Sequence, residues 1–112
     1  MDMEFDKEKW NEKGDIYYKF RRQMINDLVK NHLNSKMSKR EIIDILGQSN
    51  FRDTTTNSEL TFEIYEDYGW DIDPVETQNL IITLDSDSTL DKVYLETWRH
   101  LKGTEKREFP VR

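Results

Sequence analysis

The densest run of side-chain oxygens in this chain, Asp85 to Thr89, has residue types that bind calcium. Asp85, Asp87 and Thr89 place oxygens at alternate positions, as a calcium loop does, and Glu96 falls at the twelfth position. The sixth position of such a loop needs glycine for its sharp turn, and this chain has Leu90 there. We therefore predict a polar hairpin turn and no metal site.

A second acidic cluster falls in the long connection that we predict between the first two strands. Paired carboxylates can act as acid and base when burial raises one pKa, but nothing in this pattern indicates burial. Two interpretations stay open, a solvated loop and a loop that contacts a partner. The residues concerned are Glu66, Asp67, Asp71 and Asp73, together with Tyr68, Trp70 and Pro74.

The chain carries no recognisable catalytic motif. His32 falls near the end of a predicted helix, where a positive charge is favoured, and His100 follows the last predicted strand without a nucleophile motif nearby. There is no cysteine, no G-x-S-x-G turn and no glycine-rich phosphate loop. The sequence therefore predicts a protein that is not an enzyme and needs no cofactor.

Length and charge narrow the class of partner. A chain of 112 residues is long enough for one domain, and its 23 acidic and 17 basic residues give a net charge of −6. A nucleic-acid binder normally shows a basic patch, whereas the densest basic stretch here, 102–107, is interrupted by Glu105. No apolar run approaches the roughly 18 residues of a membrane span. We expect a protein partner, no nucleic acid and no membrane span.

Two helices are predicted in the first half. Apolar residues recur at intervals of three and four from Asp15 to about Leu33, with His32 on the same stripe, which is typical of an amphipathic helix. The second helix follows Ser38, because Ser38 and Glu41 have the spacing of a capping box. Gly47 supplies the left-handed position that ends it.

The second half alternates with period two, which is typical of strands with one buried face. Three strands are predicted, at 60–65, 80–84 and 93–98. We therefore expect an α+β fold, with two N-terminal helices packed on one face of a three-stranded antiparallel meander (ααβββ). The predicted domain spans 15–98, with an N-terminal arm at 1–14 and a charged C-terminal tail at 99–112.

The alternation leaves an aromatic-rich sheet face directed away from the helices. Exposed tyrosine and tryptophan commonly anchor protein contacts, so we predict a partner-binding surface here. An alternative stays open, in which the arm with Phe5 and Trp10, or the tail with Phe109 and Val111, covers this face. The predicted binding residues are Tyr65, Ile81, Tyr94 and Trp98 on the sheet, with Trp70 in the acidic connection.

Several segments together resemble the superfamily that includes the outer-membrane assembly lipoprotein BamE (SmpA/OmlA) and the β-lactamase inhibitor proteins. The resemblance implies an ααβββ fold, a sheet face that meets the partner, and a small lipoprotein of the bacterial cell envelope. The leader and acylated cysteine of such lipoproteins are absent from this sequence, so a lipid anchor would belong to a precursor. The segments are Phe5 and Trp10, residues 22–28, residues 37–47, and 80–85 followed by Lys92 and Val93.

The function predicted from these observations is a non-enzymatic protein-binding or assembly module of the cell envelope. The alternative is a cytoplasmic inhibitor or regulatory protein that acts through the acidic connection. A homodimer through the aromatic face is also open.

Overall fold

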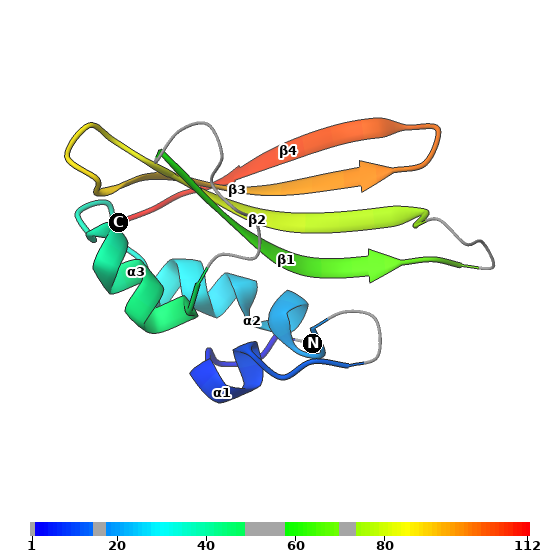
Figure 1. Ribbon diagram of the computed structural model, residues 1–112, viewed down its shortest axis with the longest axis horizontal. Coiled ribbons are helices and arrows are strands. Elements are labelled where there is room, and N and C mark those ends of the chain that lie inside the picture. Colours follow the sequence, from blue (N-terminus) through cyan, green and yellow to red (C-terminus); the bar gives the residue numbers. More distant parts are fainter. Residues whose placement is uncertain (1, 15–17, 49–57, 70–73) are drawn as a thin grey trace.

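A computed structural model describes residues 2–14, 18–48, 58–69 and 74–112. N-terminal helices precede an antiparallel meander, as predicted for the α+β class, and the helices lie together on one side of the sheet (Figure 1). The sheet has four strands in the order β1-β2-β3-β4, so the predicted count of three is wrong. The elements are α1 (Lys7–Trp10), α2 (Arg21–Asp27), the π-helical turn η1 (Leu28–His32), α3 (Lys39–Leu46), β1 (Glu59–Asp67), β2 (Glu76–Leu84), β3 (Leu90–Arg99) and β4 (Gly103–Phe109).

The first predicted helix begins later than expected. Its predicted start, Asp15, lies outside the described residues, and Tyr18 still forms an isolated β-bridge with Lys13. Helix α2 starts only at Arg21 and continues into η1. The apolar stripe is confirmed for Met24, Ile25, Leu28 and Val29, which are buried, as is Leu33 after them.

The capping box of α3 is confirmed in both directions. The Ser38 hydroxyl accepts a hydrogen bond from the backbone N–H of Glu41 at 3.1 Å. The Glu41 carboxylate accepts one from the backbone N–H of Ser38 at 3.2 Å. Gly47 ends the helix with φ of 83°, a conformation that suits glycine. These local signals fix the helix so that Ile42 and Leu46 are fully buried.

The predicted C-terminal tail is wrong, because most of it forms β4. This strand pairs with β3 from Phe109 opposite Val93 to Gly103 opposite Arg99. Six of its seven residues are exposed, so it lacks the apolar alternation that revealed the other strands. Charged side chains on an edge strand also discourage pairing with other molecules. The strand therefore looks like a solvated tail in the sequence.

The predicted arm belongs to the core on the helix side of the sheet. Trp10 is fully buried, and its ring packs edge-on against Phe62 of β1, with 6.4 Å between ring centroids. The ring centroids of Phe5 and Trp10 are 5.8 Å apart, and Phe109 is buried in the same core. Phe5, Trp10 and Phe109 thus pack on the helix side of the sheet and do not cover its opposite face. Among the described residues, no helix is both long and apolar enough to cross a membrane.

Candidate partner-binding face

We call the sheet surface opposite the helices the outer face. Successive residues of a strand point to opposite sides, so buried Leu80 and Ile82 on the helix side imply that Ile81 points outward. Ile81 pairs with Tyr94 on β3, and Thr77 pairs with Trp98. The register therefore places Ile81, Tyr94 and Trp98 on the outer face, in the orientation that the alternation predicts.

These three side chains differ in what they offer to a partner. Ile81 lies between Thr61 of β1 and Tyr94 of β3 and is only 6% exposed, so it adds little contact area. Tyr94 and Trp98 are partly exposed. Of the predicted contact residues on the outer face, these two aromatic rings therefore present the accessible surface.

Tyr65 does not belong to the outer face, contrary to prediction. A bulge between Glu63 and Tyr65 shifts the pairing, so that Tyr65 lies opposite Gln78 of β2. Gln78 lies two residues before Leu80 on the same strand, so both side chains point to the helix side. There the Arg22 guanidinium of α2 lies 4.3 Å from the centroid of the Tyr65 ring. An extra residue in one strand reverses the side on which later residues point, and strict alternation cannot reveal it.

The acidic connection is only partly described. Trp70, Asp71 and Asp73 lie outside the described residues, so their predicted contact role has no structural account. Glu66 and Asp67 are the last residues of β1 rather than loop residues. The Glu66 carboxylate accepts a hydrogen bond from the Tyr68 hydroxyl at 2.9 Å, and Asp67 accepts one from the Gly69 N–H at 2.9 Å.

Polar groups surround the two exposed aromatic rings without enclosing them. The Lys106 ammonium of β4 lies 5.8 Å from the centroid of Tyr94 and 3.9 Å from a Glu96 carboxylate oxygen. The His100 ring meets Trp98 edge-on, with 6.3 Å between centroids. Contacts of this kind at exposed sites contribute only about 0.5–1 kcal/mol each. They can therefore rearrange at low cost when another surface approaches.

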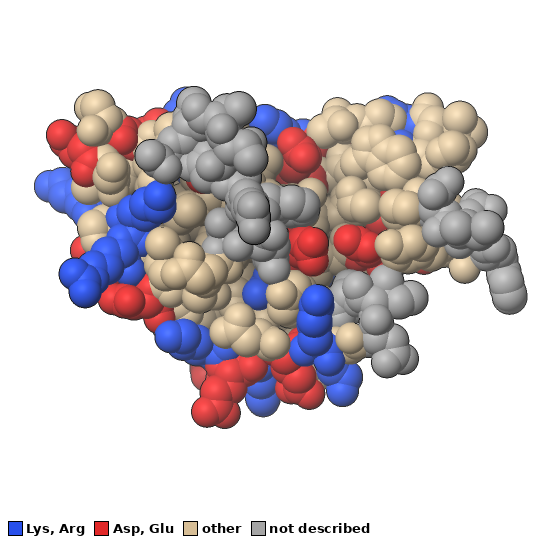
Figure 2. Space-filling view, viewed as in Figure 1, with Lys and Arg blue, Asp and Glu red and all other residues tan. Residues whose placement is uncertain are grey.

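The surface charge is uneven. Figure 2 shows lysine and arginine mixed with aspartate and glutamate along the helical edge of the molecule. Over the strand ends at the upper right of the same view, most side chains are uncharged. Around Tyr94 the surface is charged, because Lys106 and Glu96 lie beside it.

The Asp85 segment forms the predicted hairpin turn. The Asp85 carboxylate accepts hydrogen bonds from the Thr89 hydroxyl at 2.7 Å, the Thr89 N–H at 3.1 Å and the Asp87 N–H at 3.0 Å. These hydrogen bonds lower the pKa of Asp85, and the bond from the Thr89 hydroxyl has the largest effect. Its oxygens are thus used to close the turn. Within the described ranges, no three histidine, aspartate or glutamate side chains are placed to hold a metal ion.

The sequence interpretation missed a buried charge, Arg21. Its Nε donates to the carbonyl oxygen of Trp10 at 2.7 Å, and its Nη1 donates to that of Glu63 at 2.8 Å. Its guanidinium carbon lies 3.4 Å from the centroid of the Tyr18 ring. Burial lowers the pKa of Arg21 to about 10, which leaves it charged at neutral pH. Arg21 precedes Met24 by three positions, so it falls on the apolar stripe of the predicted helix. That position was the one sign in the sequence that Arg21 could be buried.

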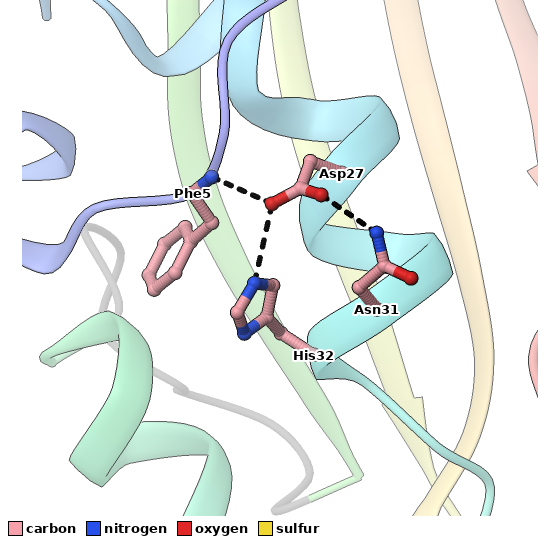
Figure 3. Close-up of polar contacts among 4 residues, drawn as sticks. All are labelled: Phe5, Asp27, Asn31 and His32. Atoms are coloured by element: carbon pink, nitrogen blue, oxygen red, sulfur yellow. Dashed lines mark hydrogen bonds and ion pairs between the residues drawn. The ribbon is translucent and has the colours of Figure 1, made fainter.

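A carboxylate on α2 holds the N-terminal segment to the helices (Figure 3). One Asp27 oxygen accepts the Phe5 N–H at 2.7 Å and lies 3.2 Å from His32 Nε2, while the other accepts an Asn31 amide N–H at 2.7 Å. The Phe5 N–H is the largest cause that lowers the pKa of Asp27. His32 is thus an exposed partner of Asp27, rather than part of the apolar stripe on which it was predicted.

Comparisons of the chain with protein-family models, with curated proteins and with solved structures find no match.

Proposed function

We propose that this protein is a non-enzymatic binding module whose outer face holds a protein partner. The observation that carries the proposal is the placement of Tyr94 and Trp98. They lie four residues apart on β3, so they share a face at a spacing of about 13 Å. The described helices all pack on the opposite side of the sheet (Figure 1). Tyrosine and tryptophan are the residue types that most often dominate binding energy at interfaces.

The area of the outer face supports a contact of ordinary size only with help from a neighbouring segment. Four strands about 4.8 Å apart and about seven residues long give a flat area of about 400 Å². A typical interface buries about 800 Å² on each partner. We therefore extend the proposed contact over the turn after β3, where His100 packs against Trp98 and Leu101 is 93% exposed.

The proposed setting is the bacterial cell envelope, in line with the predicted resemblance to assembly lipoproteins. The cytoplasmic alternative acts through the acidic connection, of which Asp71 and Asp73 lie outside the described residues. Trp70, which was predicted to take part in the proposed contact, lies outside them too. A second copy of the chain is one partner that the face could hold.

Photo-crosslinking tests the proposal. Benzoylphenylalanine replaces Tyr94 on the outer face in one variant, and exposed Arg40 on α3 in the control variant. We expect a protein adduct from position 94 in the native host and none from position 40. An adduct with the mass of two 13.6-kDa chains would identify the partner as a second copy. Adducts from position 40 alone would refute the outer face as the contact site.

A further inference from the structure

A second surface, separate from the outer face, combines an apolar floor with positively charged side chains. It is an open groove of about 590 Å³ between the α2–η1 helix and the end of the chain. Val29 and Phe109 form its floor and are 3% and 6% exposed, and partly buried Val111 continues it. Arg107 pairs with Leu95, which places it on the helix side of the sheet, away from Tyr94 and Trp98.

The rim of this groove is positively charged in a protein whose net charge is −6. Exposed Lys30, Arg107 and Arg112 line it, and its lining includes no aspartate or glutamate among the described residues. Among the described residues, none of these three cations has a carboxylate within 4 Å. The adjacent hollow on the other side of Lys30 is lined by Asp2, Glu4 and Asp27. An anion is therefore favoured at the arginine end of the groove.

The groove is also held in a defined shape. Its helical wall is the π-helical turn η1, which closes with a hydrogen bond from the Leu33 N–H to the Leu28 carbonyl at 3.1 Å. Such wide turns are frequent at functional sites. The other wall is fixed because the Ser35 N–H donates to the Arg112 carbonyl at 2.7 Å. The Arg107 guanidinium lies 4.9 Å from the centroid of the Phe109 ring, over the apolar floor.

We propose that this groove binds an extended peptide segment of a partner in which apolar and acidic residues lie two positions apart, so that both kinds point to the same side. A small-molecule site usually encloses about 70–90% of its ligand, which an open groove does not do. An extended peptide needs contact on one side only. Arginines recognise carboxylates through paired hydrogen bonds, and the floor accepts the apolar side chains.

The probe is a short synthetic peptide that carries leucine and glutamate in turn at every second position, with serine between them. In its comparison peptide, glutamine replaces glutamate. The test variant is R107E/R112E. The control variant K9E/K102E carries the same change of net charge at two exposed lysines outside the groove. Binding is measured by fluorescence anisotropy at low salt, after circular dichroism shows that both variants are folded.

We expect the glutamate peptide to bind the wild-type protein and the glutamine peptide to bind about tenfold more weakly. The R107E/R112E variant should lose about tenfold or more in affinity for the glutamate peptide, and K9E/K102E about twofold or less. Equal binding of both peptides, or equal affinities of the two variants, would overturn the proposal. Displacement of the peptide by dodecanoate at equal concentration would also overturn it, in favour of a small amphipathic carboxylate. Crosslinking from position 94 should be unchanged in R107E/R112E. A failure of the groove proposal can therefore be told apart from a failure of the outer-face proposal.

Discussion

Replacing Arg21 by methionine should destabilise the protein by about 2–4 kcal/mol. Methionine keeps the unbranched, mostly apolar stem, but it removes the hydrogen bonds that Arg21 donates to the carbonyl oxygens of Trp10 and Glu63. Hydrogen bonds to charged groups contribute about 1.5–3 kcal/mol each. Part of this cost is offset, because the guanidinium no longer has to be buried at 1% exposure. The remaining loss is a large share of the roughly 5–15 kcal/mol that stabilises a domain of this size.

Urea unfolding monitored by circular dichroism measures this loss directly. The matched control is Arg22→Met, because Arg22 also stacks on an aromatic ring but is exposed. The R22M variant should lose no more than about 1 kcal/mol of unfolding free energy, the size of an exposed cation–π contact. The urea concentration at the midpoint of R21M unfolding should therefore be well below that of R22M and of the wild type. The slope of unfolding free energy against urea concentration should be similar in all three proteins.

A different ordering would refute the reasoning. If R21M were as stable as the wild type, the desolvation of Arg21 would cancel its hydrogen bonds, and this residue would not join the N-terminal arm to β1. If R22M lost as much as R21M, burial would not be what distinguishes the two arginines.

Three further changes test the described contacts. Ser38→Ala should cost about 1 kcal/mol in urea unfolding, because it removes one half of the capping box of α3. Phe109→Ala should cost about 3 kcal/mol by the same assay, whereas the residue of a solvated tail would cost almost nothing. Since the pKa of Asp27 is lowered in the folded state, its stabilisation is present above the ordinary carboxyl pKa and is lost as pH falls through the lowered value. Unfolding free energy should therefore fall less steeply between about pH 5 and pH 2 in Asp27→Asn than in the wild type, and identical slopes would contradict the role given to Asp27.

The parts of the fold that were predictable are those written in short-range patterns. The Ser38–Glu41 spacing identifies α3 because a capping box needs only four consecutive residues. The alternation around Phe62 and Leu80 identifies two strands because one face of each is buried. The turn at Asp85 follows from aspartate and serine side chains that bond to nearby backbone groups.

The parts that were missed depend on contacts between distant segments. Strand β4 is defined by its pairing with β3, and its exposed charged residues carry no alternation. The inward turn of Tyr65 depends on a bulge against β2. Arg21 is buried only because Trp10 and Glu63, from two other elements, supply its acceptors. For the candidate site, the predictable part was the shared face of Tyr94 and Trp98.

The central claim, that the outer face holds a protein partner, is tested most directly by the affinity of that partner for Trp98→Ala. The partner identified by crosslinking is titrated against the wild type, W98A and D91A, a substitution of an exposed residue at the start of β3. An anchor residue contributes about 2 kcal/mol or more, so W98A should bind roughly 30-fold more weakly while D91A binds like the wild type. A folded W98A variant that binds as tightly as the wild type would contradict the claim.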